Sequence, residues 1–441
     1  MFAVERGDIA ERFDVRFNSP KKEVELNVGK VRLGSLCSQE PDYGVSGTAI
    51  ERTDENQPKY IRITDFSDYG IEDNHTFVTV NDYSDKHRLQ KGDIIFARSG
   101  ATVGKTYYYD GTIGEAIFAG YCIRFRIDGR KALPEYIYWY TKCNFYLNWV
   151  NSIQRPSGQP NINKEEYKTF EIFLPKIDIQ YHFVKFMNAA AQSRCEKLRE
   201  ANALLSGMSD FVCEKLKISL PTEIPKLSVG VTMRQLKADK AFNVEYYHTE
   251  RTNTIAAVKT VPHKRLGDCV YFMRDIVSAN KGQYLGLAGV QSNTGELSGA
   301  EDEATGQAFM FRTNDVLYCR LRPYLNKVWK AEYGGVCSTE FHVLRMKCNS
   351  ILPEYLAVVM RSTLVLNQSR HMMTGNTHPR ITNDDVANLL IPVPDMSIQQ
   401  KIADEMQIRR DTARTLRAEA EIEWAAAKAQ FERELLGGTG K

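Results

Sequence analysis

The chain has 441 residues, of which 43% are hydrophobic and 26% are charged, and its formal net charge is +3. This composition is typical of a soluble globular protein of two or three domains, and the small net charge permits a nucleic-acid partner without requiring one. The sequence shows no apolar run of transmembrane length, no signal peptide and no C-x-x-C pair, so we expect a cytoplasmic protein with reduced thiols.

In chain order, the first half begins with short β-branched and aromatic runs separated by Gly, Asp and Asn, which predict strands. These runs are residues 60–64, 93–97, 106–110 and 121–127. Residues 133–150, "LPEYIYWYTKCNFYLNWV", predict a helix because Pro134 suits a first turn and the aromatic residues recur at helical spacing. Residues 178–216 follow an apolar run closed by Pro175, and small or apolar residues every three or four positions predict a long helix.

The second half has the same order of predicted elements. Residues 283–290, 315–320 and 341–346 predict strands, and residues 352–369, "LPEYLAVVMRSTLVLNQS", predict a helix. Residues 397–436 predict a second long helix with charged residues between its apolar positions. The similarity of the two halves therefore suggests an internal repeat.

Matched motifs define this repeat. Leu33 and Leu266 are 233 residues apart, Arg98 and Arg320 are 222 apart, and Gln180 and Gln399 are 219 apart. A solenoid repeats every 20–50 residues, so these separations indicate a duplicated domain instead. The separation stays constant from the two LPEY segments to the long helices, which places the variable loops in the front of each half.

These elements predict an α+β fold with two duplicated, strand-rich domains that contain helices, and two long helices that form an antiparallel coiled coil. Each helix would be roughly 57 Å long, and a helix of that length needs a partner along its apolar stripe. The expected organisation is domain 1 at 1–176, helix 1 at 177–218, domain 2 at 219–395, helix 2 at 396–436 and a flexible tail at 437–441.

The sequence gives no positive sign of an enzyme. It contains no phosphate-binding loop of the P-loop or dinucleotide type, because in "RSGATVGKT" (98–106) the first Gly lies one residue too near for a P-loop. The eight histidines form no H-E-x-x-H motif, so we predict no metal site. His371 and His378 flank a Gly-containing loop, where a polar role that faces DNA or solvent is favoured over metal ligation.

Two pairs of matched loops are candidates for nucleic-acid recognition. Residues 154–163 and 371–382 are rich in Asn, Gln, Ser, Thr, Arg and His, which suit base edges and phosphates. Residues 98–109 and 320–330 place Arg and Lys among aromatic residues after a strand. The alternatives are ordinary solvated turns, and a structural salt bridge at Arg98 and Arg320. The DNA-binding candidates in domain 1 are Arg98, Ser99, Thr102, Lys105, Arg155, Ser157, Gln159, Asn161 and Asn163. Those in domain 2 are Arg320, Arg322, Tyr324, Asn326, Lys327, Thr374, Asn376, His378 and Arg380.

The duplicated pattern resembles the specificity subunits of type I restriction–modification systems over essentially the whole chain. The resemblance rests on "SGQPNINKEEYKTFEIFLPKIDIQ", "TGNTHPRITNDDVANLLIPVPDMSIQQKI", the two LPEY segments, the "GDIIFAR" strand and the two long helices. The sequence departs from a strict duplicate where Tyr181 and His182 follow the first Gln but Gln400 and Lys401 follow the second.

The resemblance implies a prokaryotic, non-catalytic scaffold that binds double-stranded DNA. Each domain would be a target-recognition domain that reads one part of a bipartite site, and the coiled coil would set the spacing between the two parts. Two methyltransferase subunits carrying S-adenosylmethionine, and restriction subunits that use ATP and Mg, would bind to it. This chain would then bind no cofactor of its own.

Three other interpretations stay open at this point. A self-sufficient methyltransferase would need a methyl-donor fold and an Asn/Asp-Pro-Pro-aromatic motif, which the sequence lacks. A protein- or glycan-binding scaffold would explain the helices but not the recurring polar loops. A specificity subunit of a system with fused nuclease and methyltransferase would fit this chain equally well.

Overall fold

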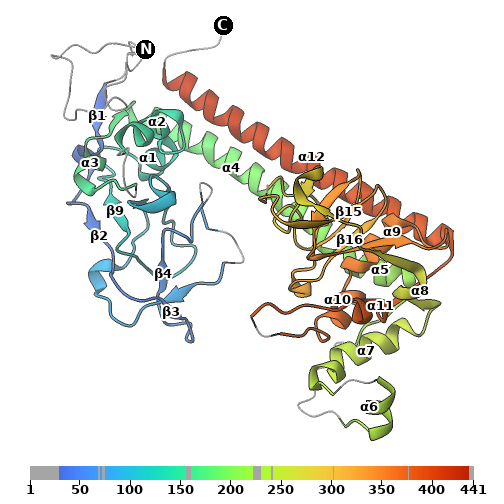
Figure 1. Cartoon of the computed structure of the whole chain (residues 1–441). Coiled ribbons are helices and arrows are strands. Elements are labelled where there is room, and N and C mark those ends of the chain that lie inside the picture. The colour runs from blue at the N-terminus through green and yellow to red at the C-terminus, as the bar shows by residue number, and fades with distance from the viewer. Residues whose placement is uncertain are drawn as a thin grey trace. The chain divides into compact units, whose positions relative to one another are not determined.

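The computed structural model describes residues 29–67, 70–71, 75–154, 160–221, 230–239, 242–300, 302–375 and 377–436 (Figure 1). The chain divides into two compact units, here called domain 1 (residues 1–196 and 419–441) and domain 2 (residues 197–418). The division falls inside both long helices, so it differs from the expected organisation, in which the helices are segments separate from the domains. Among the described residues, no helix combines the length and the apolar character needed to cross a membrane.

Domain 1 contains two four-stranded sheets and a two-stranded ladder. The first sheet has the order β2-β9-β6-β7 and is antiparallel throughout; the second has the order β3-β5-β4-β8, in which β4 and β8 run parallel. The strands are β1 (Lys30–Arg32), β2 (Asp42–Tyr43), β3 (Ile50–Glu51), β4 (Lys59–Ile61), β5 (Val78–Thr79), β6 (Asp93–Ala97), β7 (Thr106–Tyr108), β8 (Ala116–Phe118), β9 (Cys122–Arg126) and β10 (Glu171–Phe173). The short helices are α1 (Pro134–Tyr140), α2 (Asn144–Ile153) and α3 (Lys164–Lys168).

Domain 2 repeats this plan. One sheet has the order β12-β19-β16-β17, the other β13-β15-β18-β14, and β14 runs parallel to β18 as β4 does to β8. The strands are β11 (His263–Arg265), β12 (Val270–Met273), β13 (Ile276–Ser278), β14 (Tyr284–Leu285), β15 (Gln307–Phe311), β16 (Val316–Cys319), β17 (Val328–Lys330), β18 (Gly335–Ser338), β19 (Phe341–Met346) and β20 (Leu390–Pro392). The short helices are α6 (Met233–Asp239), α7 (Thr249–Val258), α8 (Leu266–Cys269), α9 (Pro353–Arg361), α10 (Thr363–Ser369) and α11 (Asn383–Ala387).

The two domains differ in where the outer pair of strands joins the second sheet. In domain 1 the pair β3-β5 adds to β4, whereas in domain 2 the pair β13-β15 adds to β18. The predicted strands at 93–97 and 341–346 coincide with β6 and β19. Each predicted LPEY helix is two helices, because Cys143 and Ser362 have extended ψ angles of 160° and 161° and start a new helix.

The long helices are α4 (Ile177–Ser206), α5 (Met208–Leu216) and α12 (Met396–Leu435). A short break at Gly207 separates α4 from α5. Within domain 1, the Phe183 and Phe431 rings lie 4.6 Å apart and the Arg194 guanidinium lies 2.6 Å from the Glu421 carboxylate. From the first pair to the second, the residue number rises along α4 and falls along α12, so these two helices are antiparallel.

The same direction holds within domain 2. Ala201, Leu205 and Ala413 form a buried apolar cluster, and Arg417 donates to the Asn202 side-chain oxygen at 3.1 Å. These α4 residues have higher numbers than those in domain 1, and their α12 partners have lower numbers. The expected antiparallel pairing of the long helices is therefore seen inside each domain.

A buried glutamine fixes the start of each long helix against its domain. The Gln180 side-chain oxygen accepts from the Leu133 N–H at 2.9 Å, and its amide donates to the Pro175 carbonyl at 2.8 Å. Gln399 does the same with Leu352 at 3.0 Å and Pro394 at 2.9 Å. Both glutamines are at most 1% exposed, so no water replaces these bonds. The backbone N–H groups of Leu133 and Leu352, the residues that cap the LPEY helices, thus obtain an acceptor from the long helix.

The tyrosine of each LPEY motif is a second matched tie. The Tyr136 hydroxyl donates to the Phe173 carbonyl, and the Tyr355 hydroxyl donates to the Pro392 carbonyl at 3.0 Å. A third tie is the buried carboxylate of Asp93 with Arg126 at 2.8 Å, matched by Asp315 with Arg345 at 2.7 Å. The repeated motifs are therefore mainly structural.

We predict that Gln180→Ala or Gln399→Ala lowers the free energy of unfolding by about 1–3 kcal/mol, because each change leaves a buried N–H and a buried carbonyl without their partner. Gln192→Ala is the matched control: its amide bonds only the exposed Glu196 carboxylate at 2.8 Å, and we expect a loss below about 0.5 kcal/mol. Urea unfolding of the three variants measures the difference. Equal losses for Gln180→Ala and Gln192→Ala would contradict the structural role.

Candidate nucleic-acid interface

In domain 1 the two candidate loops, which are about sixty residues apart in the sequence, meet in space. The Ile162 N–H donates to the Arg98 carbonyl at 2.8 Å, and the Gly100 N–H donates to the Pro160 carbonyl at 3.0 Å. Ser99 and Asn161 form a β-bridge between them. The loop after β6 and the loop before α3 therefore form one continuous edge.

Domain 2 repeats this edge bond for bond. The Ile381 N–H donates to the Arg320 carbonyl at 3.0 Å, and the Arg322 N–H donates to the Pro379 carbonyl at 2.7 Å. Leu321 and Arg380 form the equivalent β-bridge. The duplication thus extends to individual backbone hydrogen bonds in the loops, although the loop side chains differ.

A third segment joins each edge, and sequence reasoning missed it. The Arg98 N–H donates to the Tyr121 carbonyl at 3.0 Å, and the Arg320 N–H donates to the Glu340 carbonyl at 2.9 Å. Tyr121 and Glu340 are 219 residues apart, the separation found throughout the back of each half. That separation was the available signal. We call the three segments of each domain its loop edge: residues 98–105, 120–121 and 160–163 in domain 1, and residues 320–327, 339–340 and the described part of the third segment, 374–375 and 377–382, in domain 2.

The loop edge of domain 1 borders a groove of about 610 Å³. The Arg98 guanidinium lies over the Tyr43 ring, 4.8 Å from its centre, and its Nε donates weakly to the Asn161 side-chain oxygen at 3.4 Å. The Tyr121 side chain is 65% exposed. The groove is lined by Val45, Ser46, Gly47, Tyr60, Arg98, Ser99, Gly120, Tyr121, Pro160 and Asn161. Hydrogen-bond donors, an acceptor and an aromatic ring thus lie together at an open surface.

The loop edge of domain 2 carries more charge. The Arg380 guanidinium makes a two-point ion pair with Glu340, at 2.8 and 3.0 Å. Thr374 and Arg380 exchange two backbone hydrogen bonds of 2.9 Å, and Gly375 has a φ of +96° in the turn that they close. His378, in the segment that contains Arg380, and Tyr324, in the segment after β16, are both exposed. This turn needs glycine because other residues rarely adopt such a φ.

Some predicted DNA-binding residues have structural roles instead. Asn326 is 4% exposed, and its amide donates to the Arg361 carbonyl at 2.8 Å and to Asn293 at 3.1 Å, so the prediction for this residue is wrong. The Asn163 side-chain oxygen caps α3 by accepting from the Glu166 N–H at 2.9 Å, as Thr382 caps α11. The Lys327 ammonium donates to the Leu287 carbonyl at 2.6 Å.

Four of the remaining candidates lie outside the described residues: Arg155, Ser157, Gln159 and Asn376. Thr102 and Lys105 are half-buried beside the edge, and Arg322 donates to the Thr377 carbonyl at 3.3 Å. Among the described residues, neither Arg98 nor Arg320 has an ion-pair partner, so the proposed structural salt bridge at these positions is not formed. DNA contact by the exposed candidates stays a prediction.

A buried histidine supports the loop edge of domain 2. His342 is 4% exposed, and one ring nitrogen lies 3.3 Å from the Ile381 carbonyl. Burial, together with the charge of Arg320, lowers the pKa of His342 to about 4. The imidazole is therefore neutral at physiological pH.

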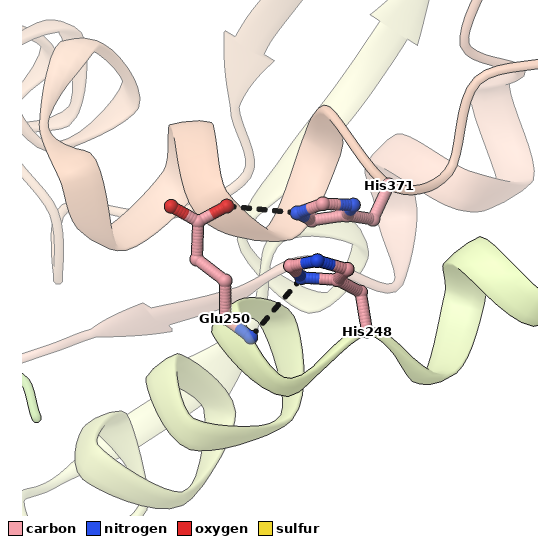
Figure 2. Close-up of side chains that lie close together, drawn as sticks. All are labelled: His248, Glu250 and His371. Carbon is pink, nitrogen blue, oxygen red and sulfur yellow. Dashed lines mark hydrogen bonds and ion pairs between the residues drawn. The ribbon is translucent and has the colours of Figure 1, made fainter. Parts of the chain in front are cut away.

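A group of side chains with metal-ligand chemistry also lies in domain 2. His248, Glu250 and His371 place one potential ligand atom each within 4.8 Å of one another (Figure 2). His371 therefore points to carboxylates rather than to solvent or DNA, which corrects the expectation for this histidine. His378 stays exposed on its loop.

We predict that domain 2 loses stability as the pH falls from about 6.5 to about 4, because the unfolded chain protonates His342 first. The contribution of neutral His342 to the free energy of unfolding is fully present above the pKa of the unfolded chain. Its loss reaches roughly 3 kcal/mol once the pH falls below the pKa of the folded chain. Urea unfolding of the parent and of His342→Gln across this pH range measures it, and the variant should show a shallower fall. Gln192→Ala, at an exposed side chain that does not titrate, is the control and should leave the slope unchanged. Identical slopes for all three proteins would contradict the assignment.

The sequence is similar to a known protein family in both halves. A family model described as "Type I restriction modification DNA specificity domain" matches residues 26–203 and 311–422, well over half of the chain. Two curated relatives are the EcoDI specificity subunit of Escherichia coli, 25% identical over 122 residues, and the HindI specificity subunit of Haemophilus influenzae, 30% identical over 114 residues. These alignments cover 27% and 25% of this chain, and the same shares of the relatives. The chain thus spans about a quarter of the length of the curated relatives it matches.

One solved structure supports the fold. A chain from a study of complex assembly and conformational transition of the type I R-M system superposes with a TM-score of 0.50 and 16% identity, covering 95% of this chain and all of that chain. The S subunit of a type I system from M. genitalium gives a TM-score of 0.46 and 12% identity over 94% of this chain and 98% of that chain. With its family model matched in both halves, the chain belongs to the family of type I restriction modification DNA specificity domains.

Proposed function

We propose that this chain is the DNA-specificity subunit of a type I restriction–modification system and that each domain reads one part of a bipartite DNA site. The observation that carries the proposal is the loop edge, built twice with matched backbone hydrogen bonds but with different side chains. A shared backbone gives both domains the same means of approaching DNA. Different side chains give them different base preferences.

The chemistry of each loop edge supports base readout in the major groove. In domain 1, Arg98 supplies a guanidinium that suits guanine, and Asn161 supplies an amide that suits adenine. In domain 2, Arg380 offers the same guanidinium, while Glu340 can accept a hydrogen bond from the amino group of cytosine. At the position of domain 1 that corresponds to Glu340, Tyr121 presents an exposed, uncharged ring.

We further propose that the chain is a non-catalytic scaffold for enzyme subunits. Two methyltransferase subunits with S-adenosylmethionine, and restriction subunits with ATP and Mg, would supply the chemistry, whether as separate chains or as a fused one. The paired long helices support this proposal, because exposed apolar side chains such as Ile408 (60%) and Ile422 (69%) remain on α12.

The decisive test is to map DNA methylation. The chain is expressed with its neighbouring methyltransferase gene in a methylation-free host, and modified adenines are located by single-molecule sequencing. We expect two short defined blocks around a fixed run of unspecified bases. No new methylation from an assembled complex that binds the methyl donor would overturn the proposal and favour a protein-binding scaffold.

We predict that Asn161→Ala weakens recognition of one block only and that Arg380→Ala weakens recognition of the other. Each lost base contact should cost about 1–3 kcal/mol against the cognate base pair. Competition binding with DNA altered in either block measures this effect. Arg130→Ala is the control, because this side chain is 89% exposed and lies outside the loop edge. If both variants affect the same block, or neither affects binding, the assignment is wrong.

We also predict that inserting seven residues into α4, with a matching insertion in α12, changes the length of the undefined spacer but not the two blocks. About two helical turns are added, so the helical pairing stays in phase. Methylation mapping reads the spacer directly. A complex that keeps the original spacer would show that the helices do not set it.

A further inference from the structure

Two segments of domain 2 that are 121 residues apart bring a mixed His–Glu cluster together. His248 precedes α7, Glu250 lies in its first turn, and His371 follows α10 (Figure 2). Helices α7 and α10 pack side by side: Asn367 donates to the Thr254 hydroxyl at 3.4 Å, and Val258 and Leu364 share the same buried core. The cluster is therefore held by helix packing and not by a flexible loop.

The side chains converge closely. One His371 ring nitrogen, Nε2, lies 2.8 Å from the Glu250 carboxylate, and the other, Nδ1, lies 3.0 Å from the Glu245 carboxylate. The His248 and His371 rings stack with their centres 4.0 Å apart and an angle of 11° between their planes. Figure 2 shows the two rings face to face, with the Glu250 carboxylate at one edge of His371. His371 is 9% exposed, and His248 is half-buried.

The contacts of His371 are compatible with a bound cation. A neutral imidazole carries one N–H and so donates to one carboxylate only, whereas an imidazolium donates to two. Both ring nitrogens face carboxylates here, so a proton or a metal ion must lie at the second contact. A metal ion between Nε2 and Glu250 leaves Nδ1–H to donate to Glu245. A ligating His whose other nitrogen donates to a carboxylate is the common arrangement around protein-bound metals.

We propose that His248, Glu250 and His371 bind one divalent transition-metal ion of the zinc class, with Glu245 orienting His371 from outside the coordination shell. Two imidazoles and one carboxylate suit zinc and its neighbours in the first transition row, whereas Mg²⁺ and Ca²⁺ prefer oxygen ligands alone. The ligand atoms already lie within 4.8 Å of one another. Because an imidazole binds a metal ion in the plane of its ring, the stacked rings must turn out of their parallel arrangement to share one ion. A water molecule from the exposed side of His248 takes the fourth position.

His248 also has a structural role, which a test of metal binding must preserve. Its Nδ1 accepts from the Glu250 N–H at 3.2 Å and caps α7. Serine also caps helices but does not ligate zinc in this setting. His248→Ser therefore removes a ligand while it preserves the cap.

Metal binding would act on the loop edge. His371 lies three residues before Thr374, which closes the turn of the domain 2 edge through Arg380. A bound ion would tie the base of this loop to α7. This consequence rests on the proposed function, whereas metal binding itself does not, because the assay below contains no DNA.

The experiment titrates the full chain, stripped with EDTA, with ZnCl₂ alone by calorimetry and repeats the titration with CoCl₂ to read the visible absorption of a four-coordinate ion. We expect one ion per chain, no competition from a large excess of MgCl₂ and a higher melting temperature with zinc. His248→Ser, Glu250→Gln and His371→Gln should each weaken zinc binding at least about tenfold, and Glu245→Gln should weaken it by about tenfold or more.

His263→Gln is the matched control, because this exposed histidine of domain 2 bonds only the Val261 carbonyl at 2.8 Å and should keep parental affinity. Thermal melting in EDTA shows which variants fold. If His371→Gln does not fold, the zinc affinity of His248→Ser decides whether the site exists. The proposal is overturned if the folded chain binds no zinc, or if His248→Ser and Glu250→Gln bind it as tightly as the parent. Either result leaves the methylation test of DNA recognition unaffected.

Discussion

The architecture of each domain depends on one buried amide. Gln180 and Gln399 each join three elements that the chain separates: the start of the LPEY helix, the proline turn and the first turn of the long helix. Leu133 and Leu352 stand where a polar cap is usual, and their side chains cannot accept a hydrogen bond. The glutamine provides that acceptor from a distance. Because a buried N–H without a partner is costly, this bond fixes where the long helix begins relative to the sheets.

From this fixed point the backbone of the loop edge follows in both domains. The tyrosine hydroxyls at 136 and 355 hold the ends of β10 and β20, and the capping boxes at Asn163 and Thr382 hold the short helices that precede those strands. The preceding loop residues then meet the segment after β6 or β16. The bonds in this series use backbone groups, buried side chains and the capping side chains of Asn163 and Thr382. Side chains outside this series can differ between the domains, as Tyr121 and Glu340 do.

Much of the fold could be predicted because it is encoded by local patterns and repeated separations. Strand runs such as 93–97 and the starts of the long helices follow from periodicity and proline placement. The meeting of three loop segments could not be predicted, because it depends on tertiary hydrogen bonds with no local signature. Asn326 shows the same limit, since the sequence alone does not distinguish an exposed asparagine from a buried one with φ near +52°. His248, Glu250 and His371 have no shared motif and converge only through the packing of α7 against α10.

The two loop edges differ in how ready their arginines are to bind. Arg98 is held through its face by Tyr43 and only weakly by Asn161, so its N–H edge is available without loss of a strong partner. Arg380 must first leave or share Glu340. An exposed ion pair is worth about 0–1 kcal/mol, whereas a two-point contact with guanine discriminates by about 1–3 kcal/mol, so the exchange is favourable only at the right base. Under the proposed function, Glu340 then needs a new donor, and the amino group of the paired cytosine is one. Domain 2 would therefore read a G·C pair through both members of its ion pair, and a mismatch there would leave a charge without a partner.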